Sequence, residues 1–209
     1  MTSKKLNPKP GRPKVINRTH VINVAMNSYW IKGVHNMSLN EICRRANVSK
    51  PTLYREFGSE DGLMTEALEL YFKEFISPFF KLFSSHQTFH EVLQKLILSL
   101  IYNQEKNSVS MGCLFTMMRN SHNLLGDKTK NKLDLLHKLL LKSYEQWIDN
   151  AKNKGNFTNQ IPSPVAAAYI DAQISNINAQ KARGENNQSI RDAAFLAFSV
   201  LVKKPFQIN

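Results

Sequence analysis

Two helix start signals lie eleven residues apart in the first quarter of the chain, and this spacing leaves room only for short helices. Ser38 and Glu41 have the spacing of a capping box, in which the Ser oxygen accepts from a backbone amide and the Glu side chain reaches back. Ser49 can cap a second helix, with Pro51 in its first turn, where the missing N–H costs nothing. Asn47 between the two helices tolerates the left-handed backbone of a tight turn. The pattern predicts two short helices joined by that turn.

The apolar residues of this segment have a spacing that buries them between the two helices. They are Leu39, Ile42, Ala46, Val48 and Leu53. Four residues of the second helix stay on the outside, where they can contact phosphates and base edges: Lys50, Thr52, Tyr54 and Arg55. A helix pair of this kind places its second helix in the DNA major groove while the first crosses the backbone. The segment therefore predicts a helix-turn-helix that binds DNA.

The rest of the chain also has the apolar spacing of helices. Further helices are expected over about residues 18–32, 59–77, 88–106, 111–123, 127–154, 163–183 and 189–203. Pro78 should kink or end the helix that Ser59 starts, because proline lacks an N–H and its ring clashes with the preceding turn. No alternating run between turn residues indicates a strand. The sequence thus predicts an all-α fold of about nine helices.

The positive charge of the chain is concentrated at its N-terminal end. The 209 residues include 28 Lys and Arg and 16 Asp and Glu, for a net charge of +12. Residues 1–58 hold eleven basic and two acidic residues, or +9, while the other 151 hold 17 and 14, or +3. A basic N-terminal quarter on a near-neutral remainder is typical of a polyanion-binding module joined to a second unit.

Cysteine usage and hydropathy favour a reducing compartment. Only Cys43 and Cys113 occur, which excludes a disulfide-rich secreted scaffold. The first twenty residues are polar and basic, so no signal peptide is expected. No apolar run approaches the roughly 18 residues that span a membrane.

The run from Val48 to Tyr54, followed by Phe57-Gly58-Ser59, carries a specific family resemblance. Together with the preceding stretch from Gly33, it resembles the DNA-binding domain of TetR-family transcriptional regulators over about residues 16–65. The resemblance implies a basic arm at 1–15, a helix-turn-helix domain at 16–62 and a C-terminal effector-binding and dimerisation domain at 63–209. It also implies a bacterial, cytoplasmic homodimer, usually a repressor that binds a palindromic operator and is released by a small-molecule effector.

The resemblance also implies which residues contact DNA. By position they are Ser38, Asn40, Lys50, Pro51, Thr52, Tyr54 and Arg55. Glu60 stands where the family often has a phosphate-contacting Lys, so that contact is not expected here. Asn47 replaces the usual Gly, which its tolerance of the left-handed backbone explains.

The N-terminal arm adds a separate signal. Arg12 and Lys14 lie in an extended Gly-Arg-Pro segment flanked by lysines, which could place Arg12 in a narrow A·T minor groove. A solvated tail without contacts to DNA is an equally good interpretation.

Aromatic residues, methionines and one cysteine of the later helices could line the effector cavity that the resemblance implies. The candidates are Tyr71, Phe75, Phe79, Tyr102, Cys113, Phe115, Met117, Met118 and Trp147. For any single residue ordinary core packing is the stronger interpretation, since these residue types suit both roles. Cys113 could be a thiol sensor or a packed, inert cysteine.

The last two helices carry dimerisation in the family. Apolar faces with many small side chains favour close packing there. The candidate interface residues are Val165, Ala168, Tyr169, Ala172, Ala194, Ala197 and Leu201.

Two other functional classes compete with a specific regulator. A small helical enzyme could use His86, His90 or Cys113, but no nucleophile elbow, phosphate-binding loop or dinucleotide fingerprint is present. The two histidines lack a third metal ligand. We therefore expect no catalysis, cofactor or metal. The other class is a non-specific DNA binder that uses charge alone.

Overall fold

The structure is a computed structural model that describes residues 16–84, 87–102, 112–158, 160–204 and 206–207. Its helices are α1 (Arg18–Lys32), α2 (Leu39–Ala46), α3 (Lys50–Phe57), α4 (Glu60–Tyr71), the π-helical turn η1 (Phe72–Ile76), α5 (Ser77–Phe83), α6 (Phe89–Tyr102), α7 (Leu114–Asn120), η2 (His122–Leu124), α8 (Asp127–Asn153), α9 (Ser163–Ala182), α10 (Asn187–Phe198) and η3 (Ser199–Leu201). These ranges contain no strand. Because α4, η1 and α5 follow one another without a break, the described α-helices form nine rods, the number predicted.

The helix start signals act as predicted. The hydroxyls of Ser38, Ser49 and Ser59 each accept a hydrogen bond from the backbone N–H three residues later. Asn47 adopts the left-handed conformation, with φ of 53°. The prediction that the Glu41 side chain reaches back to the backbone N–H of Ser38 is wrong. Its carboxylate bonds instead to two arginines of the next turn.

The helix that contains Pro78 continues through the position where a kink or an end was expected. The N–H of Ser77 bonds to the carbonyl of Phe72, five residues earlier, which makes one π-helical turn. Pro78 then occupies the first turn of α5, where a proline needs no hydrogen-bond partner. The wider turn therefore accommodates the proline within one helical rod.

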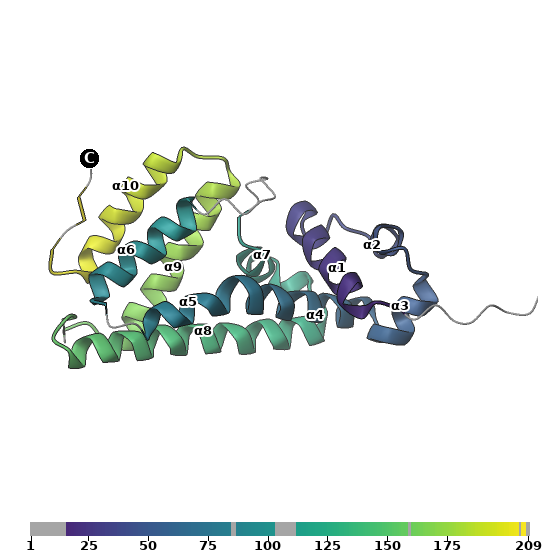
Figure 1. The fold of residues 1–209 in the computed structure, drawn as a ribbon, viewed down its shortest axis with the longest axis horizontal. Coiled ribbons are helices and arrows are strands. Elements are labelled where there is room, and N and C mark those ends of the chain that lie inside the picture. The colour runs from purple at the N-terminus through teal and green to yellow at the C-terminus, as the bar shows by residue number, and fades with distance from the viewer. Residues whose placement is uncertain (1–15, 85–86, 103–111, 159, 205, 208–209) are drawn as a thin grey trace, which may run out of the picture.

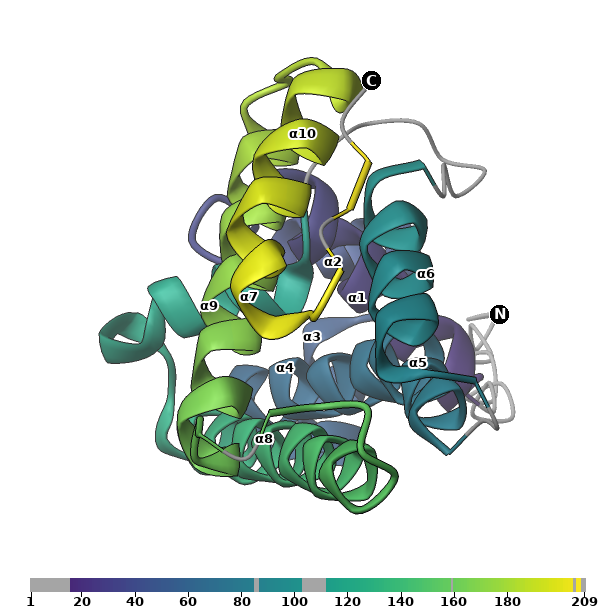
Figure 2. The ribbon, with the colours of Figure 1, turned by 90° about the vertical axis from the view of Figure 1, so that its left-hand side faces the viewer.

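The helices form two groups joined by two long rods (Figure 1). The helices α1 to α3 lie at one end, while α6, α9 and α10 lie at the other. The rod of α4 and α5 packs along α8, and α8 packs on α9. Figure 2, viewed from the end opposite α1 to α3, shows α10 beside α9 and α6. The helix α4 contacts both α1 and α8, so it connects the two groups.

The core is one continuous cluster of buried apolar side chains that extends through both groups. In its aromatic part, the Trp147 ring stacks between Phe83 and Phe89, with centroids 4.8 and 4.4 Å away. Within the described ranges, no helix combines the length and hydropathy of a membrane span.

Candidate DNA interface and its connection to the C-terminal helices

Two buried side chains hold α2 and α3 together. Ile42 on α2 and Leu53 on α3 are completely buried, and Ala46 is nearly so. The left-handed turn at Asn47 reverses the chain, and the N–H of Val48 bonds to a carbonyl of α2. This packing fixes the angle between the helices and turns the opposite face of α3 to solvent.

The expected DNA-contact residues lie on that exposed side. Ser38, Asn40, Lys50, Pro51 and Arg55 are exposed, and 46% of the Tyr54 surface is accessible. Thr52 is half-buried, and its hydroxyl lies 2.8 Å from that of Ser49. Arg12 and Lys14 lie outside the described residues.

Glu41 offsets part of the positive charge on α2. Its carboxylate accepts from Arg44 Nη2 and Arg45 Nε, each at 2.7 Å. The hydrogen bonds from these two arginines lower the pKa of Glu41 to about 2. Sequence patterning did not indicate this cluster, although the spacings of three and four residues that produce it can be read from the sequence.

Arg18 connects the start of α1 to α3 and α4. Its Nη1 donates to the carbonyl of Glu56 at 2.6 Å, and its Nη2 pairs with Glu66 of α4. The guanidinium carbon lies 4.4 Å from the centroid of the Phe57 ring. One side chain thus fixes the C-terminal end of α3 against α4, a role that sequence reasoning did not find.

Asp61 connects α4 to α8. Its carboxylate accepts from the backbone N–H groups of Lys128 and Thr129 at 2.9 and 3.1 Å, and from the Thr129 hydroxyl. Burial alone would raise the pKa of Asp61, but these hydrogen bonds hold it below the ordinary value. A Cβ on Gly126 would lie 2.3 Å from the Asp61 carboxylate carbon, so the close approach depends on glycine there. The cap joins residues 68 positions apart, and no local pattern predicts it.

Trp30 makes a second connection between the two groups. Its indole N–H donates to the carbonyl of Gly112, just before α7, at 2.8 Å. The rings of Tyr71 and Phe75 lie 5.1 and 4.9 Å from the Trp30 ring. These two predicted effector residues therefore contact the end of α1.

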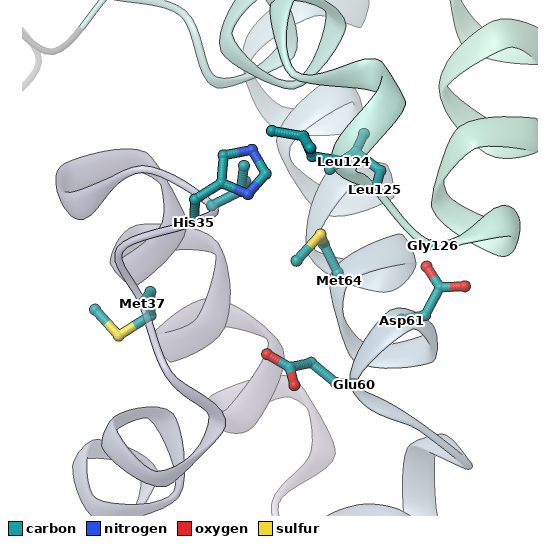
Figure 3. Close-up of a pocket in the computed structure, with 9 residues that line it drawn as sticks. His35, Met37, Glu60, Asp61, Met64, Leu124, Leu125 and Gly126 are labelled. Atoms are coloured by element: carbon teal, nitrogen blue, oxygen red, sulfur yellow. The ribbon is translucent and has the colours of Figure 1, made fainter.

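The other predicted effector residues have different environments. Phe115, Met118 and Trp147 are buried, Phe79, Cys113 and Met117 are half-buried, and Tyr102 is 45% exposed. A cavity of about 320 Å³ lies elsewhere, where the loop between α1 and α2 and the start of α4 meet the segment before α8 (Figure 3). None of the nine predicted residues lines that cavity.

A buried ionic cluster lies among α7, α8 and α9. Arg119 Nη1 and Nη2 lie 3.1 and 3.0 Å from the Asp171 carboxylate oxygens, and His137 Nε2 lies 3.1 Å from one of them. Burial would raise the pKa of Asp171, but the hydrogen bond from His137 and the Arg119 charge lower it overall. Sequence analysis missed this cluster because its members come from three distant helices.

The predicted dimer residues divide between the surface and the core. Val165, Ala168 and Ala172 are exposed on α9, and Tyr169 and Ala197 are half-buried. Ala194 and Leu201 are buried within the chain and leave little side-chain surface for a partner. In their place α10 and η3 expose Leu196 and Val200.

Of the two histidines considered for an enzyme, His86 lies outside the described residues. The His90 ring lies 4.5 Å from the Phe206 ring. Among the described residues, no group of three or more His, Cys, Asp or Glu side chains could hold a metal ion.

Residues 21–67 match the sequence model described as "Bacterial regulatory proteins, tetR family". The HTH-type transcriptional repressor ComR of Escherichia coli is 22% identical over 187 residues, which cover 88% of each chain. The E. coli repressor BdcR is 25% identical over 122 residues, 58% of this chain and 62% of BdcR.

Solved structures show the same fold. A cysteine mutant of the TetR-family regulator CifR, complexed with 26-bp operator DNA, has a TM-score of 0.79 at 17% identity and covers 91% of this chain and all of its own. Reduced NemR of E. coli has a TM-score of 0.77 at 16% identity over 91% of this chain and 99% of its own.

Proposed function

The chain belongs to the tetR family of bacterial regulatory proteins, and from that membership we propose that it is a repressor that binds operator DNA through α3. The observation that carries the proposal is the exposed face of α3, held outward by the buried Leu53, within the segment that matches the family. Lys50, Tyr54 and Arg55 on this face supply the donors that phosphates and base edges accept.

The interface assignment retains the residues that the resemblance implies and excludes Glu60. Thr52 supports the start of α3 through its hydrogen bond with Ser49, and it presents a methyl group suited to contact thymine. Ser38 and Asn40 lie at the start of α2, where the first helix of such a pair crosses the phosphate backbone. Glu60 would repel phosphate, so it has no place among these contacts.

We further propose that the chain acts as a homodimer through the exposed face of α9 and α10. Val165 on α9 is 57% exposed, Leu196 on α10 66% and Val200 on η3 62%, and Ala168 and Ala172 are also exposed on α9. Large apolar side chains on a surface favour association. A twofold dimer would place two copies of α3 in successive major grooves, about 34–36 Å apart, on a palindromic operator.

We propose a DNA-binding domain at residues 16–62 and an effector-binding and dimerisation domain at 63–209, with a basic arm at 1–15. An effector would favour a conformer in which the two α3 helices are wrongly spaced. The required coupling free energy is about 1–3 kcal/mol. In this proposal the protein is cytoplasmic and has no catalytic activity, cofactor or metal.

Selection of genomic fragments by the purified protein, followed by footprinting, tests the function. We expect discrete palindromic sites, whereas uniform coverage at all sequences would contradict specific regulation. On a selected site, Arg55→Ala should weaken binding by about 1–3 kcal/mol if the side chain contacts a base. Lys138→Ala, which removes an exposed lysine of α8, is the charge control and should leave the affinity nearly unchanged.

A further inference from the structure

The cavity beside the loop between α1 and α2, the start of α4 and the segment before α8 has an acidic wall in a chain of net charge +12. Its volume is about 320 Å³, at the small end of the range for ligand sites, about 300–1,000 Å³. Figure 3 shows Glu60 extending from α4 into the space between His35, Met37 and Met64, with Leu124 on the far side. The lining thus combines the carboxylates of Glu60 and Asp61 and the imidazole of His35 with thioether and aliphatic groups.

Of the two carboxylates that line the cavity, Glu60 is the one without a role in the described fold. Among the described residues, no cation pairs with it and no donor bonds to it. The adjacent Asp61 points away, toward Gly126, and uses its oxygens to cap α8. A partly buried carboxylate is stabilised by a cation that reaches it, because the surrounding protein screens charge less than water does.

We propose that this cavity binds a small organic cation, with a protonated primary amine on the Glu60 carboxylate and a short branched apolar tail against Met64 and Leu124. The ammonium group supplies the charge-assisted hydrogen bonds that the carboxylate lacks. The thioether of Met64 and the side chain of Leu124 offer apolar contacts to the tail. A site of this size takes a molecule of only several heavy atoms.

Such a ligand contacts the loop before α2 and the segment before α8 at once. His35 and Met37 precede α2 of the helix-turn-helix, and Leu124 precedes α8. A ligand that touches both sides stabilises the arrangement in which they meet, by an amount set by its concentration and affinity. The site differs from the predicted effector cavity, since it shares no residue with that set.

Methyl NMR of the full chain with ¹³C-labelled methionine methyl groups tests the proposal without DNA. The chain has seven methionines, and Met37→Leu and Met64→Leu variants assign the two reporters in the cavity. Titration with 3-methylbutylamine should shift both reporters with saturation in about the millimolar range. Its neutral isostere 3-methyl-1-butanol should bind at least tenfold more weakly.

Two substitutions that each remove one negative charge distinguish binding in this cavity from non-specific electrostatic attraction of the amine to the protein. Glu60→Gln should weaken amine binding at least tenfold, while Glu74→Gln, at an exposed position on the same rod, should leave it unchanged. Equal binding of amine and alcohol, equal effects of the two substitutions, or no saturable shift at Met37 and Met64 would each overturn the proposal. These outcomes leave DNA binding untouched, so they are independent of the proposed regulatory function.

Discussion

Replacing Asp61 with alanine should destabilise the protein by about 2–3 kcal/mol at neutral pH. The carboxylate caps α8 through two backbone N–H groups and the Thr129 hydroxyl. Loss of an N-terminal cap costs about 0.5–2 kcal/mol, and loss of a negative charge at a helix start about 0.3–1 kcal/mol. Thr129 is fully buried and would keep only weaker partners, which adds to the loss.

Thermal and urea denaturation of Asp61→Ala and Asp127→Ala provide the measurement. Asp127 lies in the first turn of α8, but its side chain is 96% exposed and its contact with Lys130 is 3.8 Å long. Both variants remove one negative charge from the surroundings of that turn, Asp127 from α8 itself and Asp61 from α4. We expect Asp127→Ala to cost less than about 1 kcal/mol and Asp61→Ala to lower Tm by about 4–12 °C. Equal losses would refute the capping argument.

The cap also predicts a coupling and a pH dependence. Gly126→Ala should expel the Asp61 carboxylate, so it should cost much less in the Asp61→Ala background, with a coupling of about 1–2 kcal/mol.

The pKa of Asp61 is lowered in the folded state. Its contribution is therefore complete above the unfolded pKa of about 3.9 and is lost as the pH falls through the folded pKa. The difference between wild type and Asp61→Ala should shrink over that acid range.

Three further substitutions test other contacts. Trp30→Phe removes the indole donor from the connection to α7 and should cost about 0.5–1.5 kcal/mol in urea denaturation; an unchanged midpoint would contradict that role. Leu196→Asp should shift the light-scattering mass toward a monomer, while Leu135→Asp, at an exposed leucine of α8, should not; a monomeric wild type would refute the interface. Asp171→Asn leaves Arg119 without its charged partner and should cost about 2–3 kcal/mol by thermal denaturation, less than a fully buried pair because Arg119 keeps some solvent contact.

Local chemistry explains why the helix-turn-helix could be predicted from sequence. Each serine cap acts on an amide three residues away, and the turn at Asn47 depends on one residue's backbone preference. Pro78 shows the limit of such rules. The sequence indicates a disturbed turn at this proline. Whether the helix breaks there or continues through a π-helical turn depends on the packing of the rod along α8, which the sequence does not show.

Long-range contacts could not be predicted in the same way. Helix α10 is apolar on two faces, so periodicity alone does not reveal which face the rest of the chain covers. Ala194 and Leu201 face the core, while Leu196 and Val200 face solvent. Likewise, Asp61 lies in the first turn of α4, yet its carboxylate caps a helix that starts 66 residues later.

The contacts of α4 explain how a change in the C-terminal helices reaches α3. Arg18 bonds to the end of α3 through the Glu56 carbonyl and to α4 through Glu66, so a displacement of α4 pulls on α3. Asp61, five residues before Glu66, holds α4 to the start of α8. Loss of that cap in Asp61→Ala should cost about 2–3 kcal/mol. This free energy is similar to the coupling of about 1–3 kcal/mol that an effector has to supply. A ligand that moved α8 enough to break this one cap would therefore displace α3, and the free energy of the broken cap would be large enough for regulation.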